Sequence, residues 1–129
     1  MRQATLYLLA SMVLACSAPV QRGGTVDVDF LWVKTSDGGR VHQGGASHAI
    51  LKVEPSTTGI SVGIFETKPG GTGEMWRSAM WVAALTGTLY AMEDPLDFRY
   101  SVQTETLKGR VDGPSAGGLF AVAIMAALA

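Results

Sequence analysis

The residues best suited to chemistry lie near the C-terminus and read Asp112-Gly113-Pro114-Ser115-Ala116-Gly117-Gly118. They place a serine in a glycine-bounded turn directly before an apolar segment of helical length. Small neighbours let a substrate backbone approach the Ser115 hydroxyl, and the first N–H groups of a helix can hold a developing oxyanion. A serine in this place is also an ordinary helix cap, which the local chemistry alone favours.

The D-G-P-S-A-G-G motif resembles the catalytic-serine motif of the Lon peptidase domain. The likeness continues through residues 65–74 (F-E-T-K-P-G-G-T-G-E) with the helix after them, and through the strand at 98–109. It covers about residues 26–129. The resemblance implies that Ser115 is a nucleophile that a lysine activates and that peptide substrates acylate. It gives a supporting or oxyanion role to the other motif residues, namely Asp112, Gly113, Pro114, Ala116 and Gly117.

A serine hydroxyl needs a base to accept its proton, and a lysine can serve where burial lowers its pKa. In the Lon family that lysine lies some tens of residues after the serine. The chain has lysines at positions 34, 52, 68 and 108, all before Ser115 and none at the family position. We therefore expect a domain that is incomplete at its C-terminus, with the base beyond residue 129, and no peptidase activity from residues 1–129 alone. The alternative is an inactive Lon-like binding protein of the cell envelope.

Two further readings of the serine turn come from other classes of protein. Residues 113–117 also satisfy G-x-S-x-G, the pattern of α/β-hydrolases, but no acid or histidine follows the serine. A glycine- and serine-rich turn at a helix N-terminus can also cradle a nucleotide phosphate, as in small-molecule kinases related in fold to the Lon peptidase domain. The sequence has no G-x-x-x-x-G-K-[ST] loop, so we expect an ATP-independent protein without a cofactor.

The N-terminus has the features of an export signal. Arg2 precedes an apolar run over residues 4–15, which as a helix is about 18 Å long and too short to span a bilayer. The run ends in V-L-A-C, which resembles a bacterial lipoprotein site with Cys16 as the lipidated residue. The sequence thus predicts a signal peptide over residues 1–15, a lipidated tether over residues 16–25, and a location in the cell envelope, anchored to the membrane.

The composition of the chain excludes several further classes of function. The formal charge is −1 and no basic cluster occurs, so nucleic acid is not an expected partner. The single cysteine excludes an intrachain disulfide and a cysteine-based zinc site. His42 and His48 flank a glycine loop without an obvious third ligand, so no metal is expected. Asp27 and Asp29 share one face of a strand and are expected to be solvated.

Hydrophobic periodicity predicts both strands and helices, and thus an α+β fold. The resemblance implies the arrangement of the Lon peptidase domain, a mixed sheet with packed helices. Strands are expected over residues 26–33, 48–54, 60–67 and 98–105, with a glycine-rich loop up to Gly45 between the first two. A helix capped by Thr72 is expected over residues 73–90. A second helix, buried on every side, is expected after Gly113-Pro114, with its apolar run over residues 119–129. Met75, Met80 and Met92 are expected in the core, as is one of Trp76 and Trp81. The resemblance also implies a homo-oligomeric ring.

Overall fold

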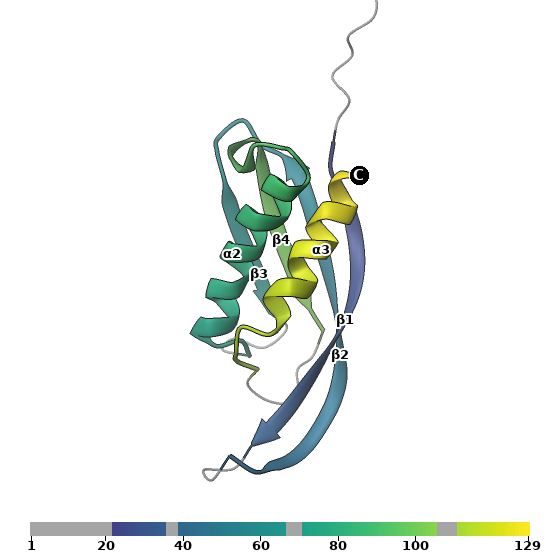
Figure 1. Cartoon of the computed structure of the whole chain (residues 1–129), viewed down its shortest axis with the longest axis vertical. Helices are drawn as coiled ribbons and strands as arrows, with labels where there is room; N and C mark the ends of the chain where they lie inside the picture. Colours follow the sequence, from purple (N-terminus) through teal and green to yellow (C-terminus); the bar gives the residue numbers. More distant parts are fainter. Residues whose placement is uncertain (1–21, 36–38, 67–70, 106–110) are drawn as a thin grey trace, which may run out of the picture.

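The computed structural model describes residues 22–35, 39–66, 71–105 and 111–129, and only the backbone of Lys34, Thr35 and His42. Its elements, in chain order, are β1 (Gly24–Thr35), β2 (Val41–Pro55), β3 (Ser61–Glu66), α2 (Glu74–Tyr90), the 3-10 helix η1 (Pro95–Asp97), β4 (Phe98–Thr104) and α3 (Ala116–Leu128). Figure 1 shows both α-helices on one face of the sheet. The expected α+β class with a mixed sheet is confirmed. The signal peptide and Cys16 lie outside the described residues, and β1 already begins within the expected tether.

The sheet has the strand order β1-β2-β4-β3. β2 pairs antiparallel with both β1 and β4, whereas β3 pairs parallel with β4. The parallel pair requires a crossover between its strands, and α2 supplies it. Within the described residues, β1 and β3 are therefore the two edge strands, and the chain reaches the serine motif only after β4.

β1 and β2 continue past the rest of the sheet as a two-stranded ribbon (Figure 1). β2 pairs with β4 only over Ala49–Pro55, whereas its earlier residues pair with β1 alone in the described part of the chain. The expectation of a glycine-rich loop up to Gly45 was wrong, because Gly44 and Gly45 are strand residues. The reason is steric: a Cβ at Gly45 would lie 2.7 Å from Cζ2 of Trp32, so the missing side chain makes room for the indole.

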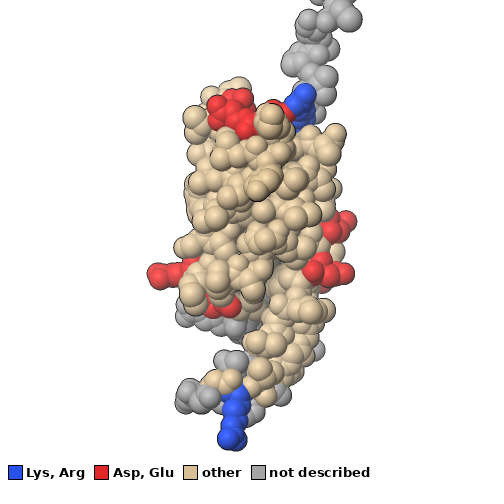
Figure 2. Space-filling view, viewed as in Figure 1, with Lys and Arg blue, Asp and Glu red and all other residues tan. Residues whose placement is uncertain are grey.

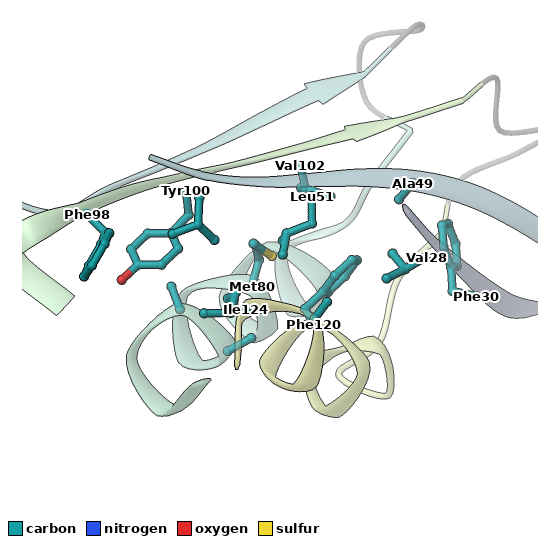
Figure 3. Packing of buried hydrophobic residues seen from close by; sticks show 14 of the residues in the cluster. Val28, Phe30, Ala49, Leu51, Met80, Phe98, Tyr100, Val102, Phe120 and Ile124 are labelled. Atoms are coloured by element: carbon teal, nitrogen blue, oxygen red, sulfur yellow. The ribbon is translucent and has the colours of Figure 1, made fainter. Parts of the chain in front are cut away.

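The core lies between the sheet and the two helices, as Figure 3 shows. Alternate residues of the strands point into it, and Trp76 of α2 packs between Phe30 and Phe120 with ring centroids 6.4 Å and 5.2 Å apart. Trp81 is on the solvent side of α2, so the two tryptophans divide as expected. Of the three methionines expected in the core, only Met80 is buried. The other two are exposed, Met92 by 91%, because they lie away from the buried stripe of α2.

The helix α3 is not buried on every side, contrary to expectation. Phe120, Ala123, Ile124 and Leu128 face the core, but Val122 is 63% exposed. Contacts reach α3 from β1 and β2 below and from α2 beside it, which leaves an outer stripe in solvent. Figure 2 shows that this helical face of the molecule carries almost no charge at its centre, with acidic and basic side chains at its margins.

A hydrogen-bonded glutamate holds the turn that leads into α2. The Glu66 carboxylate accepts hydrogen bonds from the Gly71 amide, from the amide and hydroxyl of Thr72, and from Arg77. Thr72 is thereby occupied and does not cap α2, whose N-cap residue is Gly73. The expectation of a Thr72 cap was therefore wrong, because a buried carboxylate competes for the same side chain.

We expect Glu66→Gln to lower the free energy of unfolding by about 2 kcal/mol at neutral pH, since hydrogen bonds to a charged group are lost. Burial raises the pKa of Glu66, but the Thr72 and Gly71 hydrogen bonds and the Arg77 charge outweigh it and hold the pKa below its usual range. The stabilisation is therefore present above the unfolded-state pKa and is lost as the pH falls through the lower, folded-state value.

Urea unfolding of the wild type and of Glu66→Gln at several pH values between 7 and 3 measures this effect. The difference between the two proteins should shrink as the pH falls. Glu74→Gln is the matched control, since it removes an exposed carboxylate in the first turn of α2 and should cost only roughly 0.3–1 kcal/mol. A difference that is independent of pH would contradict the assignment.

Candidate functional site

Ser115 stands at the junction between an irregular turn and α3. It occupies the N-cap position with φ −61° and ψ −28°, and its side chain makes no capping hydrogen bond in the described part of the chain. The residue is exposed. The helix-cap reading therefore does not account for the hydroxyl, which instead lies at the surface beside the first turn of α3.

Asp112 joins the serine motif to the other helix. Its Oδ1 accepts a hydrogen bond from the amide of Trp76 at 3.1 Å and one from the amide of Gly113 at 2.9 Å. Trp76 is the third residue of α2, so Asp112 caps that helix from a distant segment. The motif aspartate thus has a structural role that local sequence patterns do not reveal, in addition to the tuning role that the resemblance implies.

Backbone pairing fixes the same junction. Val111 forms a parallel bridge with Thr72, with Gly73 N donating to Val111 O at 2.8 Å and Val111 N to Gly71 O at 2.7 Å. These bonds repeat the parallel pairing of β3 with β4 beyond the ends of both strands. They hold the start of α2 beside the serine motif. Ser115 is therefore held by the sheet as well as by its own helix.

The small residues of the motif have separate tasks. Gly113 has φ +116°, which only glycine adopts without strain, and it turns the chain toward Pro114 and Ser115. A Cβ at Gly117 would lie 3.3 Å from Cβ of Ala79, so this glycine lets α3 approach α2. Ala116 begins α3 and is half-buried. The structure thus brings all the predicted motif residues together around one turn.

A cavity of about 270 Å³ opens beside Ser115. One wall is the edge strand β1, and the floor includes Trp76. Its lining consists of Phe30, Leu31, Trp32, Val33, Trp76, Val111, Asp112, Gly113, Ser115 and Ala116. The contribution of β1 was missed in the sequence, because nothing local connects residues 30–33 with a motif so far along the chain.

A second, larger hollow runs between the outer sides of α2 and α3. Its volume is about 580 Å³, and small residues such as Ala79, Ala83 and Gly118 line it together with Met75 and Val82. Pro114 and Gly117 also line it, so the hollow ends next to the serine motif. It lies on the weakly charged helical face of Figure 2.

Lys52 is the only lysine whose side chain the structure describes, and it does not accompany Ser115. It lies on β2 between the core residues Leu51 and Val53 and points to the opposite face of the sheet, where Nζ is 2.8 Å from Oε1 of Glu54. Lys68 and Lys108 lie outside the described residues. The described site therefore contains a serine without a lysine base.

His48 lies in β2, not in a loop, and contacts both aspartates of the β1 outer face. Nδ1 is 3.0 Å from Oδ1 of Asp29, and Nε2 is 3.4 Å from Oδ1 of Asp27. The two aspartates are exposed, as expected, but they also hold an imidazole. Among the described residues no group of three histidine, cysteine, aspartate or glutamate side chains is arranged to hold a metal ion.

Comparison with known proteins leaves the family open. No protein-family model and no curated protein matches the chain. The chain is similar in structure to a protein from Thermus thermophilus of known crystal structure, with a TM-score of 0.44 and 15% identity over 87% of this chain and 17% of that one. The chain thus spans less than a fifth of that protein's length. None of the described helices is long and apolar enough to cross a membrane.

Proposed function

We propose that the chain carries the nucleophile of an ATP-independent, Lon-like serine endopeptidase. The observation that supports this best is the position of Ser115, an exposed residue whose side chain makes no capping hydrogen bond to α3 in the described part of the chain. It shares a cavity with the edge strand β1. A serine that only caps the start of a helix does not require a neighbouring cavity.

The geometry suits acyl transfer to a peptide. An extended substrate can lie along the free edge of β1 by strand addition, which brings its backbone past Ser115. Oγ would attack a substrate carbonyl while a base takes its proton, and the proton would then pass to the departing amine. Amides in the first turn of α3 are placed to stabilise the oxyanion. Water would finally hydrolyse the ester on Ser115.

The base is proposed to be a lysine located beyond residue 129. The one described lysine, Lys52, is ion-paired on the far face of the sheet and cannot take this role. Without such a lysine, the same cavity would serve the alternative, an envelope protein that binds peptides without cleaving them. The α/β-hydrolase reading has less support, since that pattern needs a strained turn and Ser115 has ordinary helical backbone angles.

Membrane anchoring and assembly belong to the same proposal. Lipidation at Cys16 would hold the protein at the surface of a membrane through the segment that leads to β1. Assembly into a homo-oligomeric ring would give the weakly charged outer side of α2 and α3 a partner surface, in keeping with exposed apolar residues such as Val82 and Val122.

The test begins with the coding DNA after codon 129 and uses the product of the whole reading frame. We expect a lysine some tens of residues after Ser115, and covalent labelling of the protein by an alkyl fluorophosphonate, located by mass spectrometry on Ser115. Ser115→Ala should abolish the label. Ser78→Ala, which changes an exposed serine of the neighbouring helix, is the matched control and should retain it.

A stop codon directly after residue 129 would refute the peptidase and favour the peptide-binding alternative. Labelling that persists in Ser115→Ala would also refute it. Residues 1–129 expressed alone should not react, because they lack the base.

A further inference from the structure

His48, Asp27 and Asp29, which we term the junction cluster, link the two strands of the ribbon by charge. His48 lies directly opposite Asp29 in the β1–β2 register. Each ring nitrogen faces a different carboxylate, at 3.0 Å and 3.4 Å. A protonated imidazole donates from both nitrogens and satisfies both carboxylates, whereas a neutral ring donates from only one.

The junction cluster lies where the described sheet narrows from four strands to the two strands of the ribbon. Ala49 is the last residue of β2 paired with β4, through Thr104, and the amide of Glu105 donates to the His48 carbonyl at 3.2 Å. Before His48, the described part of β2 pairs with β1 alone. A cross-strand contact at this point therefore affects how firmly the whole ribbon is held to the body.

Trp32 connects this junction to Ser115. It lines the Ser115 cavity, and it also lines a separate cavity of about 470 Å³ together with Asp29, His48 and Glu105. Its indole rests on Gly45 of the opposite strand, where a Cβ would be only 2.7 Å away. Trp32 is thus a wall shared by the two cavities, and its place depends on the pairing of the two ribbon strands.

We propose that the junction cluster regulates the Ser115 cavity. Protonated His48 holds the two ribbon strands together where they leave the rest of the sheet, and it thereby keeps Trp32 in place as a wall of the cavity. Deprotonation of His48 weakens the pairing of the ribbon strands and frees Trp32 to move. The inference rests on the proposed function in so far as the Ser115 cavity is taken as the peptide site.

The charges around His48 set the direction of the effect. Asp27 and Asp29 face it from β1 and Glu105 from the end of β4, while Lys52 of its own strand is paired with Glu54. The hydrogen bond with Asp29 raises the pKa of His48 above 6.5, against the opposing effect of desolvation. The ribbon is therefore most stable below that unfolded value and loses this contribution as the pH rises through the folded-state pKa. Above it, uncompensated carboxylates remain.

Nuclear magnetic resonance tests the coupling without any need for activity. The ring signals of His48 and the indole N–H of Trp32, assigned with Trp32→Phe, are followed from pH 5 to 9. We expect the Trp32 signal to shift with the midpoint of His48. Asp29→Asn should lower both midpoints, and His48→Gln should abolish the Trp32 shift. His42→Gln is the matched control and should change neither. A Trp32 signal that ignores the titration of His48 would overturn the inference.

Peptide binding separates this inference from the proposed function. The probe is an acetylated, amidated tetrapeptide of alternating valine and phenylalanine, and the protein is Ser115→Ala, which cannot cleave it. We expect about fivefold tighter binding below the His48 midpoint than above it, at the low end of usual coupling between sites. Equal affinity at both pH values would overturn the regulation. Absence of binding at every pH, with Trp32 still following His48, would refute the peptide site and leave the coupling supported.

Discussion

Replacing Gly87 with alanine is expected to lower the free energy of unfolding by about 3 kcal/mol, at the upper end of the usual cost of overpacking. Gly87 is buried inside α2, at the point where α3 crosses it. A Cβ there would lie 2.6 Å from the Ala121 carbonyl oxygen and 3.0 Å from Cβ of Ile124. Both contacts belong to a packed helix, so the two helices must move apart.

The sign of the change in the free energy of unfolding distinguishes overpacking from helix propensity. Helix propensity alone predicts that Gly87→Ala stabilises α2 by about 1 kcal/mol. Chemical denaturation of both proteins decides between the two effects. Gly118→Ala is the matched control, because a Cβ at Gly118 in α3 meets no atom within 4 Å. It should leave the protein equally or slightly more stable. A stabilised Gly87→Ala would contradict the close crossing of α2 and α3.

Replacing Gly73 with alanine is expected to cost about 2 kcal/mol, because the new Cβ would overlap the Asp112 carboxylate. Asp112 must then turn away and give up its hydrogen bond to the amide of Trp76. α2 would lose its cap, and the turn that carries Ser115 would lose its attachment. The Ser115 labelling rate of the full reading-frame product should fall with stability.

A double-mutant cycle isolates this contact. Asp112→Ala alone should cost about 1 kcal/mol, the usual effect of a lost cap. In that background Gly73→Ala should cost much less than it does alone, since the carboxylate it collides with is gone. Asp112→Asn, which keeps an acceptor oxygen, should be milder than Asp112→Ala. Additive costs of Gly73→Ala and Asp112→Ala would show that the two residues act independently.

Local periodicity in the sequence predicts most of the elements. The alternation from Phe98 to Thr104 and the helical spacing after Gly73 both correspond to the structure. The ribbon was missed because Gly44 and Gly45 look like loop residues until Trp32 is placed across them. No local rule could show that, since the pairing depends on the register of two strands.

The serine motif shows the same difference between local features, which the sequence predicts, and long-range contacts, which it does not. Sequence alone identifies Ser115 and its small neighbours, which act over a few residues. It does not predict that Asp112 caps a helix that begins far upstream, or that β1 forms a wall of the cavity. These contacts depend on how the sheet brings distant segments together. Thr72 was expected to cap α2 because the buried partner Glu66 was not visible in the local pattern.

The charges on β1 also bear on how the protein behaves at high concentration. A free strand edge that accepts a peptide can in principle accept the same strand of a second molecule, which is how sheets aggregate. Asp27 and Asp29 are exposed on the outer face of this edge strand, beside His48 of β2. Two copies paired edge to edge would bring two carboxylates from each molecule close together, with only one imidazole from each, His48, to offset them. β1 is thus open to a neutral peptide but protected by like charge against association with itself.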